Sequence, residues 1–193
     1  MNRFLPVALL AGLGLSAVAP AANAYEIDPL TRQPLMQSAD PSKAQATTIP
    51  REIVDYPTKQ RPGTIVINTS ERRLYLVMPD GKAMRYGVGV GRPGFDWAGS
   101  QSITRKAEWP TWTPPASMLK RRPDLPRFMP GGPENPMGAR ALYLGSTLYR
   151  IHGSNEPETI GQAVSSGCIR MLNEDVIDLY ERVKVGTRVV VAR

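Results

Sequence analysis

The chain has 193 residues, a formal net charge of +7 at pH 7, and a single cysteine and a single histidine. This length suits one domain with a hydrophobic core, and the basic balance favours negatively charged partners. One cysteine and one histidine cannot build a zinc site by themselves, so we expect no metal ion and no other cofactor.

Residues 1–24 have the pattern of a secretory signal peptide. A basic start at residues 1–3 precedes an apolar run at 4–18, and the segment ends in Ala22-Asn23-Ala24, a small-x-small cleavage pattern. The apolar run is shorter than the roughly 20 residues that cross a bilayer, which favours cleavage over a membrane anchor. We therefore expect residues 25–193 to be exported to the periplasm without a transmembrane span. Export argues against nucleic acid as the partner and leaves the acidic cell wall.

Residues 25–62 are rich in Pro, Gln, Ser, Thr and Ala. Such a composition buries too little apolar surface to offset the entropy of the chain. We therefore expect a flexible N-terminal arm at 25–62 and an ordered domain at 63–193.

Strand-type patterns open this domain. Runs of β-branched and aromatic residues predict strands at 64–69 and 73–78. The turn composition at 79–82 predicts a hairpin with the extended segment at 83–90. The glycines from Gly87 to Gly94 have dinucleotide-binding spacing, but the βαβ pattern is missing, so a loop with a close backbone approach fits better.

Residues 109–136 are rich in proline and contain Trp109, Trp112 and the basic cluster 120–122. Long irregular loops inside a compact domain usually have a function. Two interpretations stay open: a lid or wall of a substrate groove, and a proline-stiffened packing insert.

The remaining pattern places a histidine at the end of a strand. Strands are predicted at 141–144 and 147–151, so His152 follows the second one, and a short helical turn is predicted at 157–163. Asn173 has the character of a helix N-cap, and an apolar stripe runs on to Val183. Gly186 acts as a stop signal before a last, central strand at 187–192. The fold class is therefore mainly β with one helix.

Cys168 is the candidate nucleophile. A lone cysteine in an exported chain indicates a free reactive thiol or an intermolecular bridge, although free cysteines elsewhere are often buried small hydrophobes. The Ser-Ser-Gly sequence before Cys168 is a poor context for a core strand. His152 is the only imidazole available to take the thiol proton. The resulting thiolate would attack an acyl carbon, with the amides of Gly167 and Cys168 directed at the oxyanion.

Two neighbouring groups have open roles. The second ring nitrogen of His152 needs an acceptor, which is either Glu156 or a backbone carbonyl such as that of Gly153. Arg170 lies two residues after the cysteine. It either grips a substrate carboxylate or forms a structural salt bridge to Asp175 or Glu174.

The sequence Ile151-His152-Gly153, followed by Ser165-Ser166-Gly167-Cys168-Ile169-Arg170-Met171, resembles the signature of the YkuD-type L,D-transpeptidases. The resemblance runs from about Thr64 to Val191. It implies a β-rich fold of the sandwich or barrel kind that is peculiar to this family. It also implies a two-step acyl transfer on peptidoglycan stem peptides, with carbapenems acylating the cysteine.

The same resemblance implies roles for individual residues. Cys168 would be the nucleophile, His152 the base, and the Gly153 carbonyl the group that orients the imidazole. Arg170, Gly167 and Ser166 would line the oxyanion and substrate site. Many family members have a histidine where this chain has Ser166, so His152 would act without a second imidazole.

The acyl acceptor stays open at the level of sequence. It is a second stem peptide in a 3→3 cross-link, a free D-amino acid, or the amine of an envelope protein. Water as the acceptor would make the chain an L,D-carboxypeptidase. A wall-binding protein without turnover is the non-enzymatic alternative, and a general cysteine peptidase is a weaker one because its local signatures are missing.

Overall fold

The computed structural model describes residues 49–193. The predicted signal peptide at 1–24 and most of the predicted arm at 25–62 lie outside these residues. None of the helices in the described part is long and apolar enough to cross a membrane.

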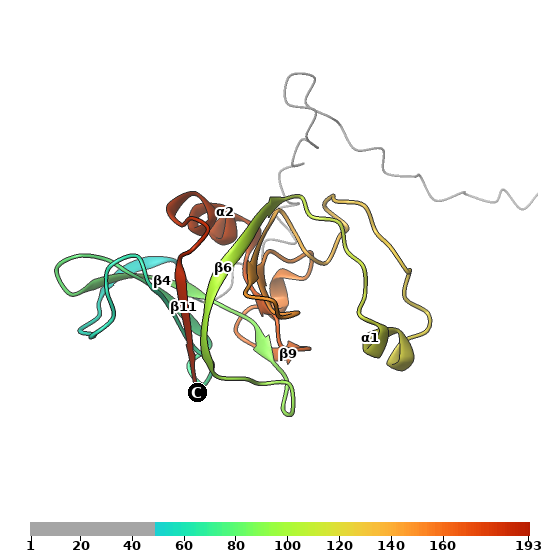
Figure 1. Cartoon of the computed structure of the whole chain (residues 1–193), viewed down its shortest axis with the longest axis horizontal. Helices are drawn as coiled ribbons and strands as arrows, with labels where there is room; N and C mark the ends of the chain where they lie inside the picture. The colour runs from blue at the N-terminus through green and yellow to red at the C-terminus, as the bar shows by residue number, and fades with distance from the viewer. Residues whose placement is uncertain (1–48) are drawn as a thin grey trace, which may run out of the picture. The chain divides into compact units, whose positions relative to one another are not determined.

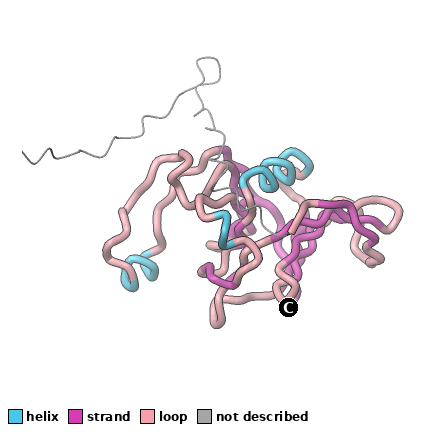
Figure 2. The backbone as a smooth tube through the Cα atoms, turned by 180° about the vertical axis from the view of Figure 1, so that it is seen from behind, coloured by secondary structure: helices cyan, strands magenta, loops and turns pink. Residues whose placement is uncertain are grey.

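Among the regular elements of the described chain strands outnumber helices, which confirms the mainly β prediction, although α1 is a helix that was not predicted (Figures 1 and 2). The elements in chain order are β1 (Glu52–Asp55), β2 (Ile65–Asn68), β3 (Arg73–Val77), β4 (Lys82–Gly87), β5 (Val90–Gly91), β6 (Gly99–Glu108), α1 (Ala116–Arg121), β7 (Arg140–Leu144), β8 (Arg150–His152), the 3-10 turn η1 (Pro157–Thr159), β9 (Ala163–Ser165), β10 (Ile169–Arg170), α2 (Asn173–Arg182) and β11 (Arg188–Ala192).

Nine of these strands form one sheet in the order β1-β4-β3-β2-β11-β6-β7-β8-β10, and β5 pairs with β9 separately. The C-terminal strand β11 is central, as predicted, because it pairs in parallel with β2 and antiparallel with β6. The predicted hairpin is present as β3 and β4. Its turn uses Asp80 and Gly81 with φ of 59° and 67°, values that Asn, Asp and Gly accept most easily.

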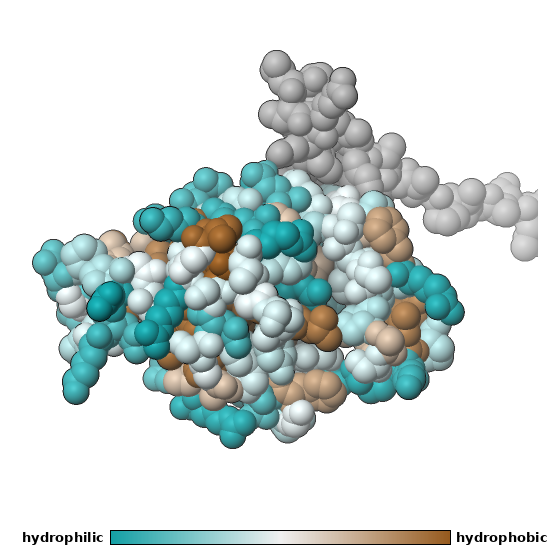
Figure 3. Space-filling view, in the orientation of Figure 1, coloured by the Kyte–Doolittle hydropathy of each residue, from teal (hydrophilic) through white to brown (hydrophobic). Residues whose placement is uncertain are grey.

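The sheet folds around one hydrophobic core. Apolar side chains from both halves of the sheet meet the buried face of α2, and the fully buried members include Ile65, Leu74, Tyr86, Leu142 and Leu179. A separate cluster covers the other face of the β2–β4 strands. The face of the molecule in Figure 3 is mostly hydrophilic, with hydrophobic residues in small separate groups.

The ordered chain begins earlier than the predicted start at residue 63. Strand β1 pairs antiparallel with β4, and Tyr56 stacks on Tyr75 with ring centroids 4.4 Å apart. An edge strand needs only one hydrogen-bonded partner, and Val54 and Tyr56 supply enough apolar surface to cover the smaller cluster. The average composition of residues 25–62 did not reveal that Val54 and Tyr56 would pack against this cluster.

Strand β6 has no counterpart among the predicted elements. Its residues are mostly polar and exposed, so the alternating apolar pattern of a strand is absent. Pairing on both sides, with β11 and β7, defines it instead. Lys106 also donates to the carbonyls of Tyr180 and Val183 at the end of α2, at 2.6 and 2.7 Å.

The glycine-rich loop around β5 makes the close backbone approach that was expected. Gly89 and Arg170 exchange two backbone hydrogen bonds of 2.9 Å. A Cβ atom at Gly89 would lie 2.8 Å from the carbonyl oxygen of Thr159. The loop thus braces strand β10, which follows Cys168.

The predicted N-cap of the C-terminal helix is wrong. Helix α2 starts at Asn173 itself, and its N-cap is Leu172, which makes no side-chain capping bond. The Asn173 side chain bonds to two other backbone segments, as described below. At the other end, the helix ends at Arg182, and Gly186, with φ of 90°, serves the turn into β11.

Candidate active site

Parallel pairing of β8 and β10 brings the two parts of the motif together. Ile169 pairs with Ile151 and Arg170 with His152. Directly paired residues of adjacent strands point to the same face, and alternation puts Cys168 on the side of Arg170. Accordingly, Cys168, His152 and Arg170 all line one cavity of about 780 Å³.

His152 is the buried member of this group. Its side chain is only 5% exposed, and its Nδ1 lies 2.6 Å from the carbonyl oxygen of Gly153. Because a carbonyl oxygen can only accept a hydrogen bond, Nδ1 carries the proton and Nε2 is left as the basic nitrogen. The Gly153 carbonyl, and not Glu156, is therefore the acceptor for the ring.

Burial, and after it the nearby Arg170 guanidinium, lower the pKa of His152 from 6.5 to about 4, against the opposing backbone hydrogen bonds with Gly153 and Met137. The imidazole is therefore neutral at pH 7. A neutral ring is ready to accept a proton, as a general base must.

The Cys168 thiol is partly exposed, and its Sγ lies 3.7 Å from the carbonyl oxygen of Leu148. Ser165 braces the loop before it. Its Oγ donates to the Cys168 carbonyl at 2.6 Å and accepts from the Gly167 amide at 3.1 Å. The Gly167 amide is thus engaged within the loop, which leaves the Cys168 amide as the better oxyanion donor of the expected pair.

Aromatic side chains also contact the loop that contains Gly167 and Cys168. Trp97 donates from Nε1 to the Gly167 carbonyl at 2.9 Å and stacks on Tyr149 with centroids 4.4 Å apart. Gly167 has φ of 105°, and a Cβ there would lie 2.6 Å from Tyr149 Cε1. Only glycine fits at this position, so the glycine before the cysteine has a steric cause.

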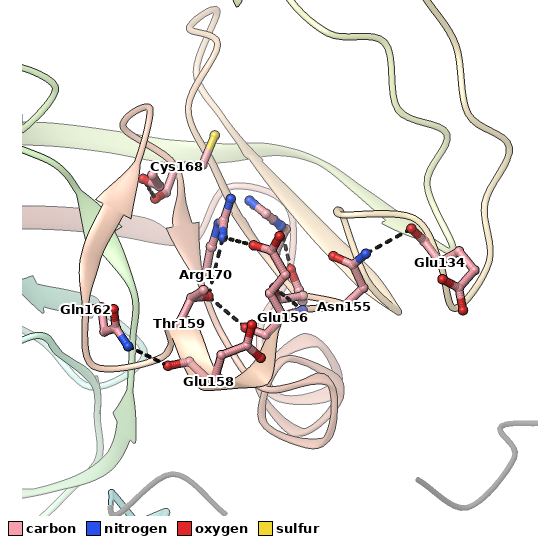
Figure 4. Close-up of polar contacts among 12 residues, drawn as sticks. Glu134, Asn155, Glu156, Glu158, Thr159, Gln162, Cys168 and Arg170 are labelled. Carbon is pink, nitrogen blue, oxygen red and sulfur yellow. Dashed lines mark hydrogen bonds and ion pairs between the residues drawn. The ribbon is translucent and has the colours of Figure 1, made fainter. Parts of the chain in front are cut away.

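The salt-bridge partner of Arg170 differs from the two that the sequence led us to expect. Its guanidinium binds Glu156 at 2.7 Å and approaches Thr159 Oγ1 at 3.4 Å (Figure 4). Asp175, one of the two expected salt-bridge partners, instead lies 3.7 Å from Arg51. Arg170 still lines the cavity, where its side chain is 21% exposed.

Ser166 faces the same cavity and accepts a hydrogen bond of 3.3 Å from Arg92. Arg92 in turn lies over the ring of Phe95, 4.1 Å from its centroid. A small hydroxyl thus faces the cavity at position 166, where it contacts a cation.

The proline-rich insert at 109–136 forms a wall of this cavity. Trp112, Met118 and Leu125 line it together with the motif residues. Helix α1 lies on the insert (Figure 1), and a bridge between Trp112 and Met129 joins the two arms of the loop. Of the two interpretations left open by the sequence, the groove wall is the one that the structure supports.

Several residues near the site carried no recognisable signal in the sequence. Trp97, Tyr149 and Phe95 are ordinary aromatic residues until the fold brings them to the cysteine loop. The Asn173 side chain reaches the backbone of Ala139 and Ser154. The sequence shows Asn173 close after the cysteine motif, but the predicted helix N-cap accounted for this residue equally well.

Comparisons with known proteins agree with this architecture. The YkuD family model, described as the L,D-transpeptidase catalytic domain, matches residues 62–191. The probable L,D-transpeptidase ErfK/SrfK of Escherichia coli is 42% identical over 77% of this chain. The chain spans about half the length of the curated relatives it matches, 49% in that case.

Solved structures include L,D-transpeptidase 3 from Mycobacterium tuberculosis, with a TM-score of 0.55 and 19% identity over 67% of this chain and 60% of that one. This likeness concerns the fold alone. A Brucella melitensis structure, described as a probable carnitine operon oxidoreductase, is 45% identical, with a TM-score of 0.52 over 76% of this chain and 95% of that one.

Proposed function

The chain belongs to the YkuD family of L,D-transpeptidase catalytic domains, and on that premise we propose that it is an exported cysteine acyltransferase acting on peptidoglycan stem peptides. The observation that carries the proposal is the pairing of β8 with β10, which puts Cys168 and His152 on one cavity. Cleavage after residue 24 and a periplasmic location are part of this proposal.

In the first step the Cys168 thiol gives its proton to Nε2 of His152. The sulfur attacks the carbonyl carbon of the peptide bond after the third, diamino-acid residue of a donor tetrapeptide. The carbon–nitrogen bond breaks, and the terminal D-Ala leaves as an amine that takes the proton back from the imidazolium. The product is a thioester on Cys168. The neutral state of His152 at pH 7 supports its role as the base.

Three sets of groups on the cavity would serve the acylation step. The Cys168 amide is proposed to donate to the oxyanion, since the Gly167 amide is engaged with Ser165. Arg170, with Arg121, Arg122 and Arg150 on the same cavity, would attract the carboxylates of a stem peptide. Ser166, which precedes Cys168 by two residues and lines the same cavity, would also contact the substrate.

In the second step an amine attacks the thioester carbon and His152 takes a proton from that amine. The carbon–sulfur bond then breaks, and the imidazolium returns the proton to the sulfur, which restores the Cys168 thiol. With the side-chain amine of a second stem as acceptor, the product is a 3→3 cross-link. A free D-amino acid or the amine of an envelope protein would enter the same way. Water in its place would give the L,D-carboxypeptidase reaction.

The primary test is intact-mass analysis of the purified protein incubated with a carbapenem. We expect a stoichiometric adduct on the wild type and on the control Val185→Ala, whose side chain is 56% exposed away from the cavity lining. Cys168→Ala should form no adduct. An adduct of equal yield on Cys168→Ala would refute the role of the thiol.

The reaction itself is tested by mass spectrometry of muropeptides from cells that express the wild type or Cys168→Ala. More 3→3 dimers with the wild type would support cross-linking, more exchanged stems would support D-amino acid transfer, and more tripeptides would support hydrolysis. Loss of wall-bound protein in the variant would point to protein tethering. Identical profiles and identical wall-bound protein would leave the non-catalytic wall-binding alternative.

A further inference from the structure

We propose that Asn173 is a positioning residue that fixes the tautomer of His152 by holding the backbone that carries its acceptor. The proposal deepens the proposed function, since it concerns the base of the same site. Asn173 Oδ1 accepts from the Ala139 amide at 2.9 Å, and its Nδ2 donates to the Ser154 carbonyl at 3.1 Å. The carboxamide therefore ties the start of α2 to the segment that leaves β8.

That segment contains the peptide unit on which His152 depends. The Gly153 carbonyl, which accepts from Nδ1, belongs to the peptide bond between Gly153 and Ser154. Up to Gly153 the backbone is held by the sheet, through His152 O to the Met171 amide at 2.8 Å and the Gly153 amide to Arg140 O at 3.0 Å. Beyond Gly153 the chain leaves the strand, and the bond from Asn173 Nδ2 to the Ser154 carbonyl holds it there.

Two glycines make room for this arrangement. A Cβ at Gly153 or at Gly138 would collide with Asn173 Oδ1. A Cβ at Gly138 would also lie 2.5 Å from the Gly153 carbonyl carbon and from the Ser154 nitrogen. The Gly153–Ser154 peptide thus packs directly against Gly138, with the Asn173 carboxamide alongside. Gly138 has φ of 63°, a conformation that glycine adopts without strain.

Helix capping does not account for the Asn173 side chain. The N-cap residue of α2 is Leu172, and Asn173 is already helical. Both polar atoms of its carboxamide are used by residues 19 and 34 positions away in sequence. These contacts connect the helix start to the base, and they hold the Gly153 carbonyl where it accepts the hydrogen bond from Nδ1. In this tautomer Nε2 carries no proton and can accept the one from the thiol.

The test compares Asn173→Asp and Asn173→Ala with the wild type. Asp keeps an oxygen toward the Ala139 amide and suits the first turn of a helix, but it has no donor for the Ser154 carbonyl. Asn68→Asp is the matched control, since Asn68 accepts from the Glu71 amide in a turn far along the sheet. If Asn173→Ala does not fold, Asn173→Asp alone decides.

The first readout is the imidazole nitrogen spectrum of the free protein, where one histidine gives one set of signals. We expect the wild type and Asn68→Asp to be in the Nδ1–H form, and the Asn173 variants to move to a mixture of tautomers. The second readout is the rate of acylation by a carbapenem. It should fall by at least about tenfold in the Asn173 variants, because a base in the wrong tautomer cannot take the proton. Initial noncovalent binding should stay within about twofold.

A folded Asn173→Asp that retains the Nδ1–H tautomer and the wild-type acylation rate would overturn the proposal. So would a loss of thermal stability with an unchanged tautomer, since that result describes a purely structural residue. The tautomer is read without turnover. A failure of Cys168 to react in the wild type would therefore refute the proposed function and leave the test of Asn173 intact.

Discussion

The titration of His152 offers the sharpest test of the site's electrostatics. The side chain is buried, and its pKa is lowered from 6.5 to about 4, first by burial and second by Arg170. One unit of pKa corresponds to about 1.4 kcal/mol, so the shift represents roughly 3 kcal/mol of disfavoured protonation in the folded state.

The sign of the effect on stability follows from proton binding. Between pH 6.5 and pH 4 the unfolded chain binds a proton at this histidine and the folded chain does not, so the contribution of His152 to stability falls as the pH drops through this window. Below pH 4 both states are protonated, and the contribution changes no further.

Nitrogen–proton correlation spectra from pH 3.5 to pH 8 measure the midpoint directly, because the chain has one histidine. We expect a midpoint near 4 for the wild type. Arg170→Gln should raise it only part of the way to 6.5, since burial is the larger cause. A wild-type midpoint between 6 and 7 would refute the inference that the base is desolvated.

Three further predictions concern stability. Burial raises the pKa of Asp175 from 3.8 to about 6, so ionisation of this carboxyl opposes folding increasingly from pH 3.8 to pH 6 and fully above it. Asp175→Asn should therefore raise the free energy of unfolding by about 1–2 kcal/mol at pH 8 and lose this gain below pH 4. An equal gain in urea titrations at both pH values would contradict the assignment. Gly153→Ala places a methyl group against Asn173 and should cost about 1–3 kcal/mol in thermal unfolding, so an unchanged Tm would show that the packing is looser than described. Leu142→Ala removes a fully buried side chain and should cost about 2–5 kcal/mol in urea unfolding while leaving carbapenem acylation of the folded protein unchanged, so a cost below about 1 kcal/mol would place Leu142 outside the core.

The parts of the protein that sequence predicted correctly depend on neighbouring residues in the chain. Strands β2, β3 and β11 carry apolar patterns that local periodicity reveals, and the Asp80-Gly81 turn has the residues its dihedral angles require. The same holds for the position of His152 at the end of β8. The motif around Cys168 indicated the family because its residues are contiguous in the chain.

Tertiary structure decided the features that depend on residues far apart in the chain. Strand β6 is polar and exists because two other strands pair with it, and β1 is ordered because β4 offers an edge. The pairing of Arg170 with Glu156, and the reach of Asn173 to Ser154, follow from the register of β8 and β10 and from the entry of α2. Local sequence encodes which conformations a segment prefers, whereas the partner of a polar side chain depends on which distant segment the packed core brings within hydrogen-bond range.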